Sequence, residues 1–137
     1  MRSTPFYYLS SCCLCLLLTA SASAADSCES YLAQRDYQQA FTSCMQEAKQ
    51  GSVDAQALLG AMYYEGAGVA QNKQQAAVWL RKAAQRNNAN AQALLGAMYL
   101  EGAGVLQDKK QAIKWLTKSA EQGNAQARAI LKTIQNQ

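Results

Sequence analysis

A repeat of 36 residues occupies most of this 137-residue chain and constrains its fold more than any other feature. Residues 54–89 and 90–125 align without a gap, and 24 of the 36 aligned positions are identical. Self-similarity at a period of about 20–50 residues is typical of proteins built from stacked supersecondary units. We therefore expect a short row of similar units, since the chain is too short for two independent hydrophobic cores.

Each repeat begins with a helical pattern that ends at glycines. Apolar residues recur at i, i+3, i+4, i+7 and i+8, which is the spacing of one helix face. This stripe consists of Ala55, Leu58, Leu59, Met62 and Tyr63, copied as Ala91, Leu94, Leu95, Met98 and Tyr99. Gly66 and Gly68 follow the first copy. Glycine adopts positive φ angles at no steric cost, so we expect the helix to end there.

A second helical pattern follows in each repeat. It begins after Asn72 in one copy and Asp108 in the other, and both side chains are expected to cap a helix N-terminus. Its apolar positions are Ala76, Trp79, Leu80, Ala83 and Ala84, copied as Ala112, Trp115, Leu116, Ser119 and Ala120. Gly60 and Gly96 each cost about 1 kcal/mol inside a helix relative to alanine, which predicts a close helix–helix crossing. A single helix pair cannot bury its apolar face, so neighbouring pairs must stack.

The flanking segments predict further helices. Residues 26–34 and 37–50 favour a hairpin around Arg35 and Asp36, and residues 126–135 repeat only the first helix of a unit. The expected organisation is a signal peptide (1–24), an N-terminal capping hairpin (25–53), two repeats (54–89 and 90–125) and a C-terminal capping helix (126–137).

The first 24 residues have the pattern of a cleaved secretory signal peptide. Arg2 precedes an apolar run over residues 9–19, and small residues at positions 22 and 24 predict cleavage after Ala24. The apolar run is much shorter than the roughly 20 residues that span a bilayer, so we expect no membrane span after cleavage. A lipoprotein signal at Cys12 is the alternative, but the main apolar run follows that cysteine. We expect a periplasmic or secreted protein.

Removal of the signal peptide leaves two cysteines, Cys28 and Cys44. In an oxidising compartment an even number of cysteines indicates a disulfide. Counting outward from the expected turn at residues 35–36 places the two cysteines opposite each other, as a bridge requires. The alternative is a pair of free buried thiols.

The chemistry available for catalysis is limited. The chain contains no histidine, which excludes Ser–His and Cys–His nucleophile pairs, imidazole bases and histidine metal ligands. We expect no catalytic residues, no metal site and no cofactor. Glu65 and Glu101 resemble a catalytic carboxylate pair. They occupy equivalent positions of two repeats, however, and a repeat copies any exposed residue in the same way.

The charge of the mature chain is mildly positive. Residues 25–137 contain 12 basic and 9 acidic residues, a net charge of +3. Lysine and arginine concentrate in the second helices, which we interpret as a solvated outer face; contact with anionic envelope polymer or lipid headgroups is the alternative. No aromatic residues interleave these charges, so no nucleic-acid partner is expected.

The sequence resembles the Sel1-like repeat, a relative of the tetratricopeptide repeat, in the pattern Ala55-x3-Leu59-Gly60-x2-Tyr63-x2-Gly66-x-Gly68-Val69, then Ala76-x2-Trp79-Leu80-x-Lys82-Ala83-Ala84. The pattern recurs over residues 91–120. Asn72, Asn87 and Ser119 stand where the family usually has aspartate, glycine and alanine. The resemblance implies an all-α fold: a short α-solenoid of stacked antiparallel helix hairpins.

The resemblance also implies that the first helices line a concave surface. The candidate partner-binding residues lie off the apolar stripe or at its margin: Gln56, Ala57, Ala61, Tyr64, Glu65, Gln92, Ala93, Ala97, Leu100 and Glu101. Alanines allow a ligand backbone to come close, while Tyr64 and Leu100 offer apolar anchors beside a polar rim. The alternative is that Tyr64 and Leu100 pack on the loop that follows them.

The function implied by the resemblance is a non-catalytic protein–protein interaction module of the cell envelope. Its partner would be another envelope protein or a peptide, and its role that of an adaptor, an assembly or regulatory factor, or an immunity protein that inhibits an antibacterial effector. The alternative is a secreted hydrolase or binder acting on β-lactams or the cell wall. Secreted members assigned that activity carry a disulfide in every repeat, whereas this chain has one at most and no Ser-x-x-Lys sequence. Self-association is a third hypothesis.

Overall fold

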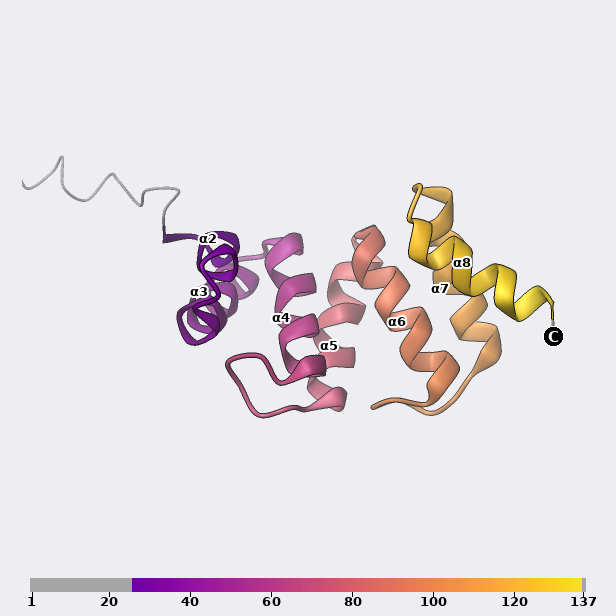
Figure 1. The fold of residues 1–137 in the computed structure, drawn as a ribbon, viewed down its shortest axis with the longest axis horizontal. Helices are drawn as coiled ribbons and strands as arrows, with labels where there is room; N and C mark the ends of the chain where they lie inside the picture. Colours follow the sequence, from indigo (N-terminus) through magenta and orange to yellow (C-terminus); the bar gives the residue numbers. More distant parts are fainter. Residues whose placement is uncertain (1–25, 137) are drawn as a thin grey trace, which may run out of the picture.

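The computed structural model describes residues 26–136 as a row of helices with no strand in that range (Figure 1). The helices are α2 (Cys28–Ala33), α3 (Tyr37–Lys49), α4 (Val53–Glu65), α5 (Lys73–Gln85), α6 (Ala89–Glu101), α7 (Lys109–Glu121) and α8 (Ala125–Gln135). The all-α solenoid predicted from the sequence is confirmed. The predicted signal peptide, residues 1–24, lies outside the described residues. No helix of the described range is long and apolar enough to cross a membrane.

The helices pair as antiparallel hairpins, and the hairpins stack in sequence order (Figure 1). The most extensive contacts lie within the hairpins α4–α5 and α6–α7. First helices also contact one another, α4 with α6 and α6 with α8, whereas contacts among the second helices α3, α5 and α7 are weaker. The first helices α4, α6 and α8 therefore form the inner side of the row and the second helices form its outer side.

Capping side chains begin the helices at intervals of 36 residues. The predicted caps are confirmed: Asn72 accepts a hydrogen bond from the Gln75 amide at 3.0 Å, and Asp108 accepts one from the Gln111 amide at 3.0 Å. The first helices have equivalent caps in Ser52, Asn88 and Asn124. Each cap satisfies one amide that the helix itself leaves without a partner, so both repeats set their helix boundaries in the same way.

The close crossing predicted from Gly60 and Gly96 is confirmed. A Cβ added to Gly60 would lie 2.5 Å from Leu80 Cγ, and one added to Gly96 would lie 2.7 Å from Leu116 Cγ. Both leucines are almost completely buried. Glycine at this position therefore lets the leucine of the second helix lie directly on the backbone of the first. The close packing offsets the lower helix propensity of glycine.

Neighbouring repeats meet at a second kind of glycine, in the loop after each first helix. Gly68 has a φ of 70° and lies so close to the backbone carbonyl of Tyr37 that a Cβ would overlap it. Gly104 has a φ of 69° and makes the same approach to the carbonyl of Lys73. Each loop thus lies against the start of the preceding second helix, 31 residues earlier in the chain. The shared contact fixes how one hairpin sits on the next.

Side-chain hydrogen bonds repeat the same connection at the opposite ends of the first helices. Asn88 Nδ2 donates to Asp54 Oδ1 at 2.9 Å, and Asn124 Nδ2 donates to Asn90 Oδ1 at 3.2 Å. Each of these hydrogen bonds joins a first helix to the first helix of the next hairpin along the chain. The row is therefore held together by nearest-neighbour contacts, as expected for a solenoid.

The predicted disulfide between Cys28 and Cys44 is present, and it joins α2 to α3. The two Cα atoms lie 4.7 Å apart, and both side chains are buried. The Cys28 amide also donates to Glu47 Oε1 at 2.8 Å, which adds a second link between these helices. Since α2 has only six residues, it depends on these links for its position.

Candidate binding groove on the inner side

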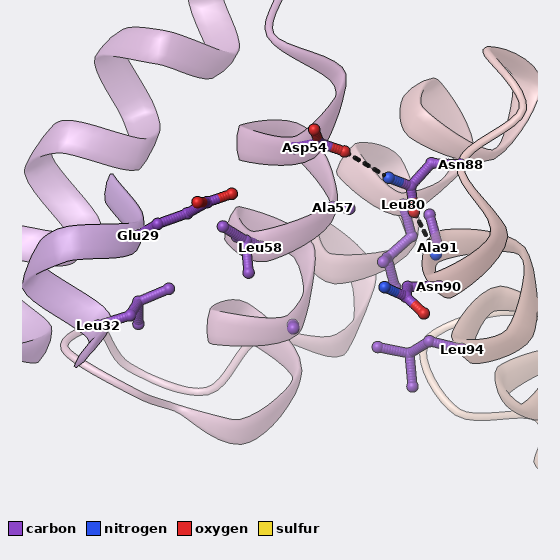
Figure 2. Close-up of a pocket in the computed structure, with 11 residues that line it drawn as sticks. Glu29, Leu32, Asp54, Ala57, Leu58, Leu80, Asn88, Asn90, Ala91 and Leu94 are labelled. Carbon is purple, nitrogen blue, oxygen red and sulfur yellow. Dashed lines mark hydrogen bonds between the residues drawn. The ribbon is translucent and has the colours of Figure 1, made fainter. Parts of the chain in front are cut away.

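A hollow with a volume of about 420 Å³ opens on the inner side of the row, in the size range of ligand pockets. We call it the inner groove. Its lining residues come from α2, α4 and α6, with one residue from α5 and the cap of α6: Glu29, Leu32, Asp54, Ala57, Leu58, Ala61, Leu80, Asn88, Asn90, Ala91 and Leu94 (Figure 2). The groove thus crosses three consecutive hairpins and requires their stacking.

The floor of the inner groove is apolar. Leu32, Leu58 and Leu94 supply one aliphatic side chain each from α2, α4 and α6, and all three are only partly buried (Figure 2). Ala57 and Ala61 lie beside Leu58 on α4. Because alanine side chains are short, they leave space that a larger residue would fill. This floor can bury an aliphatic or aromatic side chain of a partner.

The rim of the inner groove is polar. Asp54 uses one carboxylate oxygen to accept a hydrogen bond from Asn88, and the Asn90 side chain uses its oxygen to accept one from Asn124. Neither the second oxygen of Asp54 nor the Asn90 amide nitrogen has a hydrogen-bond partner within residues 26–136. The Glu29 carboxylate is likewise unpaired in this part of the chain. These groups can accept from or donate to a ligand without breaking an internal bond.

The structure places two predicted site residues, Ala57 and Ala61, in the inner groove. It also places Leu58 and Leu94 there, which the sequence assigned to the core-facing stripe. That stripe is wider than the surface that the neighbouring helices cover, and these leucines lie at its edge, partly buried rather than enclosed. One sequence signal could have indicated their partial exposure: Leu58 and Leu94 lie three residues after Ala55 and Ala91, at the edge of the stripe.

Gln56, Gln92 and Ala93 correct the prediction, because the structure buries them. Gln56 and Gln92 are only 7% and 1% exposed. Gln56 Nε2 donates to the Ala48 carbonyl and Gln92 Nε2 donates to the Ala84 carbonyl, both at 3.1 Å. Each glutamine thus satisfies a carbonyl at the end of the preceding helix. These side chains hold the hairpins together and do not form the margin of a binding surface.

The remaining predicted residues lie outside the inner groove. Tyr64 is partly buried against the core, and Lys73 Nζ lies 5.4 Å from its ring centroid. Leu100 lines a separate hollow of about 530 Å³ with Ile130 and Ile134 of α8. Glu65, Ala97 and Glu101 line neither hollow, and both glutamates are exposed at helix ends. Tyr64 and Leu100 therefore do not line the inner groove with Ala57 and Ala61.

Replacement of Gln92 by leucine should lower the free energy of unfolding by about 1–3 kcal/mol, because it removes two hydrogen bonds of this buried side chain, one donated to the Ala84 carbonyl and one accepted from Gln122 Nε2. Urea denaturation followed by circular dichroism measures the loss. The matched control is Gln126→Leu on α8, which makes the same chemical change at an exposed position. Equal stability of the two variants would show that the buried hydrogen bonds contribute nothing.

Charges are segregated between the two sides of the row. Among the helices of the inner side, α2, α4 and α6 contain acidic residues and no lysine or arginine, whereas α8 contains Arg128 and Lys132. The second helices α5 and α7 contain seven basic residues and one acidic residue: Lys73, Arg81, Lys82, Lys109, Lys110, Lys114, Lys118 and Glu121. Lys82 lies 4.4 Å from the Trp79 ring centroid, and Lys118 lies 5.2 Å from that of Trp115. The helices of the outer side within the two repeats are thus basic, and the charged residues that line the inner groove are acidic.

The described residues contain no group of three or more histidine, cysteine, aspartate or glutamate side chains that could hold a metal ion. Neither Glu65 nor Glu101 lines the inner groove. The groove itself contains two carboxylates, amides and aliphatic side chains. This set of groups suits recognition by hydrogen bonds and burial.

The Sel1 repeat profile matches residues 53–88 and 89–124. The chain belongs to the Sel1 repeat family. Both matched segments have the expected length of 36 residues and begin one residue before the boundaries expected at 54 and 90. Sel1 repeat proteins are generally protein–protein interaction modules. No match was found among curated proteins.

Three solved structures of bacterial Sel1 repeat proteins are similar to this chain. A Sel1 repeat protein from Oxalobacter formigenes shares 37% identity with a TM-score of 0.69 over 73% of this chain and 41% of its own length. A protective antigen of uropathogenic Escherichia coli strains shares 34% identity with a TM-score of 0.67, over 75% of this chain and 24% of its own. Cysteine-rich protein B of Helicobacter pylori shares 28% identity with a TM-score of 0.68, over 75% of this chain and 79% of its own length. The chain thus spans less than half the length of the first two.

Proposed function

We propose that this Sel1 repeat protein is a non-catalytic binding module of the cell envelope whose inner groove receives a segment of another protein. The observation that carries the proposal is the apolar floor of the groove, where Leu32, Leu58 and Leu94 remain partly exposed between polar groups. An anchor side chain buried on such a floor, surrounded by a polar rim, is the usual arrangement of an interaction hot spot. The role would be that of an adaptor, an assembly or regulatory factor, or an inhibitor of an effector.

The location in the envelope has its own support. The Cys28–Cys44 disulfide closes a hairpin of the described structure, and disulfides persist in oxidising compartments such as the bacterial periplasm. The pattern of residues 1–24 agrees with export. A partner is therefore sought among periplasmic and secreted proteins.

The test is in-cell cross-linking of the tagged protein, followed by capture from the envelope and mass spectrometry. The double variant Leu58→Lys with Leu94→Lys places two charges on the floor and should lose the captured partner. The control is Val78→Lys with Ile113→Lys, the same change at residues of the outer side that are 42% and 39% exposed. This control should retain the partner.

A second variant addresses the folding of the first, since lysine on a half-buried helix face can destabilise the row. Ala61→Leu fills the inner groove with an aliphatic side chain and leaves its charge unchanged. Circular dichroism establishes that each variant is helical before capture. If both groove variants keep the same partner as the wild-type protein, the binding surface lies elsewhere; if the protein captures only copies of itself, self-association replaces the proposal.

A further inference from the structure

We infer that the inner groove selects a cationic segment, in which an aliphatic side chain stands next to a lysine or an arginine. The inference rests on the proposed function, because it specifies the ligand of the same groove. It is carried by the position of the two acidic side chains on the rim, Glu29 and Asp54, neither of which forms an ion pair with another described residue. These come from different hairpins, so their placement depends on the stacking of the row and not on one local sequence.

The carboxylates flank the apolar floor. Figure 2 shows Glu29 extending from α2 toward Leu58, while Asp54 lies at the start of α4, on the side of the groove near Asn88. An aliphatic side chain that enters between Leu58 and Leu94 therefore has Glu29 on the α2 side and Asp54 on the side of Asn88. A basic residue next to that side chain in the ligand can reach one of them with its flexible stem, while its own methylene groups lie on the floor.

Each of these carboxylates lies in the first turn of its helix, where the helix dipole favours a negative charge, but no basic side chain of the described residues pairs with it. Neither Glu29 nor Asp54 forms an ion pair with another residue of the range 26–136, and no basic residue lines the groove. The lysines and arginines of the repeats lie on α5 and α7, on the opposite side of the row, except Arg86, which follows α5 and donates from its Nη1 to the Gly51 carbonyl. A concave surface with charges of one sign concentrates ligands of the opposite charge and raises their rate of association.

Other classes of ligand fit this groove less well. An acidic segment would be repelled by both carboxylates. A neutral apolar segment would fill the floor but would remove water from the carboxylates without giving them a partner, which is unfavourable. A cationic aliphatic segment buries the floor and pairs the carboxylates at the same time. The free amide nitrogen of Asn90 can in addition donate to a main-chain carbonyl of the segment.

The test is a selection of random heptapeptides displayed on phage against the immobilised, disulfide-bonded protein. We expect enriched peptides in which leucine, isoleucine or valine stands next to lysine or arginine. The affinity of the most enriched synthetic peptide, measured by calorimetry, should fall when the salt concentration is raised from about 50 to 300 mM, since ions screen exposed charges. Enrichment of acidic or uncharged peptides would overturn the inference.

Isosteric variants separate charge from shape. Glu29→Gln with Asp54→Asn should weaken the selected peptide about 3- to 20-fold, the range expected for two partly exposed ion pairs. Asparagine at position 54 keeps the acceptor for Asn88, so the rim retains its geometry. The matched control, Asp108→Asn with Glu121→Gln, removes the same net charge at exposed positions outside the groove, with asparagine able to cap the helix as Asn72 does, and should change the affinity less than twofold.

The outcomes distinguish this inference from the proposed function. If the groove selects peptides that Leu58→Lys with Leu94→Lys abolishes but Glu29→Gln with Asp54→Asn does not weaken, the groove binds and the charge selectivity is wrong. If the enriched peptides bind the Leu58→Lys, Leu94→Lys variant as well as the wild type, both are wrong. A selection that enriches no peptide also overturns the inference.

Discussion

Replacing Gly104 with alanine is expected to lower the free energy of unfolding by about 2–5 kcal/mol. Two costs add. An L-residue at a φ of 69° costs roughly 1–2 kcal/mol, and a Cβ at this position would overlap the Lys73 carbonyl and lie 2.8 Å from the Gln74 nitrogen. Because the obstacle is backbone, no side-chain rotation relieves it and the two hairpins must separate. Urea denaturation followed by circular dichroism measures the loss.

Gly123→Ala is the matched control for this variant. Gly123 has a φ of 94°, and a Cβ there would meet no atom within 4 Å. It therefore reports the backbone cost alone, and the difference between the two variants is the contribution of the close contact between repeats. Equal losses in Gly104→Ala and Gly123→Ala would show that the loop is free to move away and does not fix the stacking.

Removal of the disulfide should cost about 3 kcal/mol, and the loss should be local. The bridge closes a loop with a sequence separation of 16 residues, for which chain entropy predicts this magnitude. In Cys28→Ala with Cys44→Ala, hydrogen exchange of the α2 and α3 amides should accelerate. Exchange in α6 and α7 should stay unchanged, because a solenoid transmits stability only between neighbours.

Reduction of the wild-type protein provides the control, since it opens the bridge to two thiols without substituting any residue. It should accelerate exchange in the same two helices. A uniform acceleration along the whole row would contradict the nearest-neighbour description and would indicate a single cooperative unit. Unchanged exchange in α2 and α3 would mean that the Glu47 contact and the packing of α3 on α4 hold the hairpin on their own.

The elements of this fold were predictable because their signals are local and occur twice. Asparagine and aspartate side chains, such as Asn72 and Asp108, commonly cap the first turn of a helix. Glycine inside a helix, as at Gly60 and Gly96, lowers helix stability unless a second helix packs closely against it. The disulfide followed from counting residues on either side of one turn. In each case the physical cause lies within the same hairpin as the sequence signal, so neither the neighbouring hairpin nor its packing had to be known.

The candidate site was less predictable because its residues depend on the neighbouring hairpin. Glutamine is usually exposed, and only the approach of the preceding helix end places the Ala84 carbonyl within reach of Gln92. Leu58 and Leu59 belong to the same apolar stripe. Leu59 is buried and Leu58 is not, because the neighbouring helices cover only part of the stripe. Glu29 lies 25 residues before Asp54 and meets it in one groove through the stacking of α2, α4 and α6.

The contacts between hairpins permit the protein to change length in fixed steps. The bond from Asn88 to Asp54 and that from Asn124 to Asn90 are the same contact at two places, as are the approaches of Gly68 and Gly104 to a preceding helix. A duplicate of residues 53–88 inserted after Asn88 would therefore meet on each side the surface that it already fits. Such a duplication adds one leucine to the floor and one acidic residue to the rim. Duplication of a repeat would therefore lengthen the groove, and with it the ligand segment that the groove can bind, without any change to the capping helices.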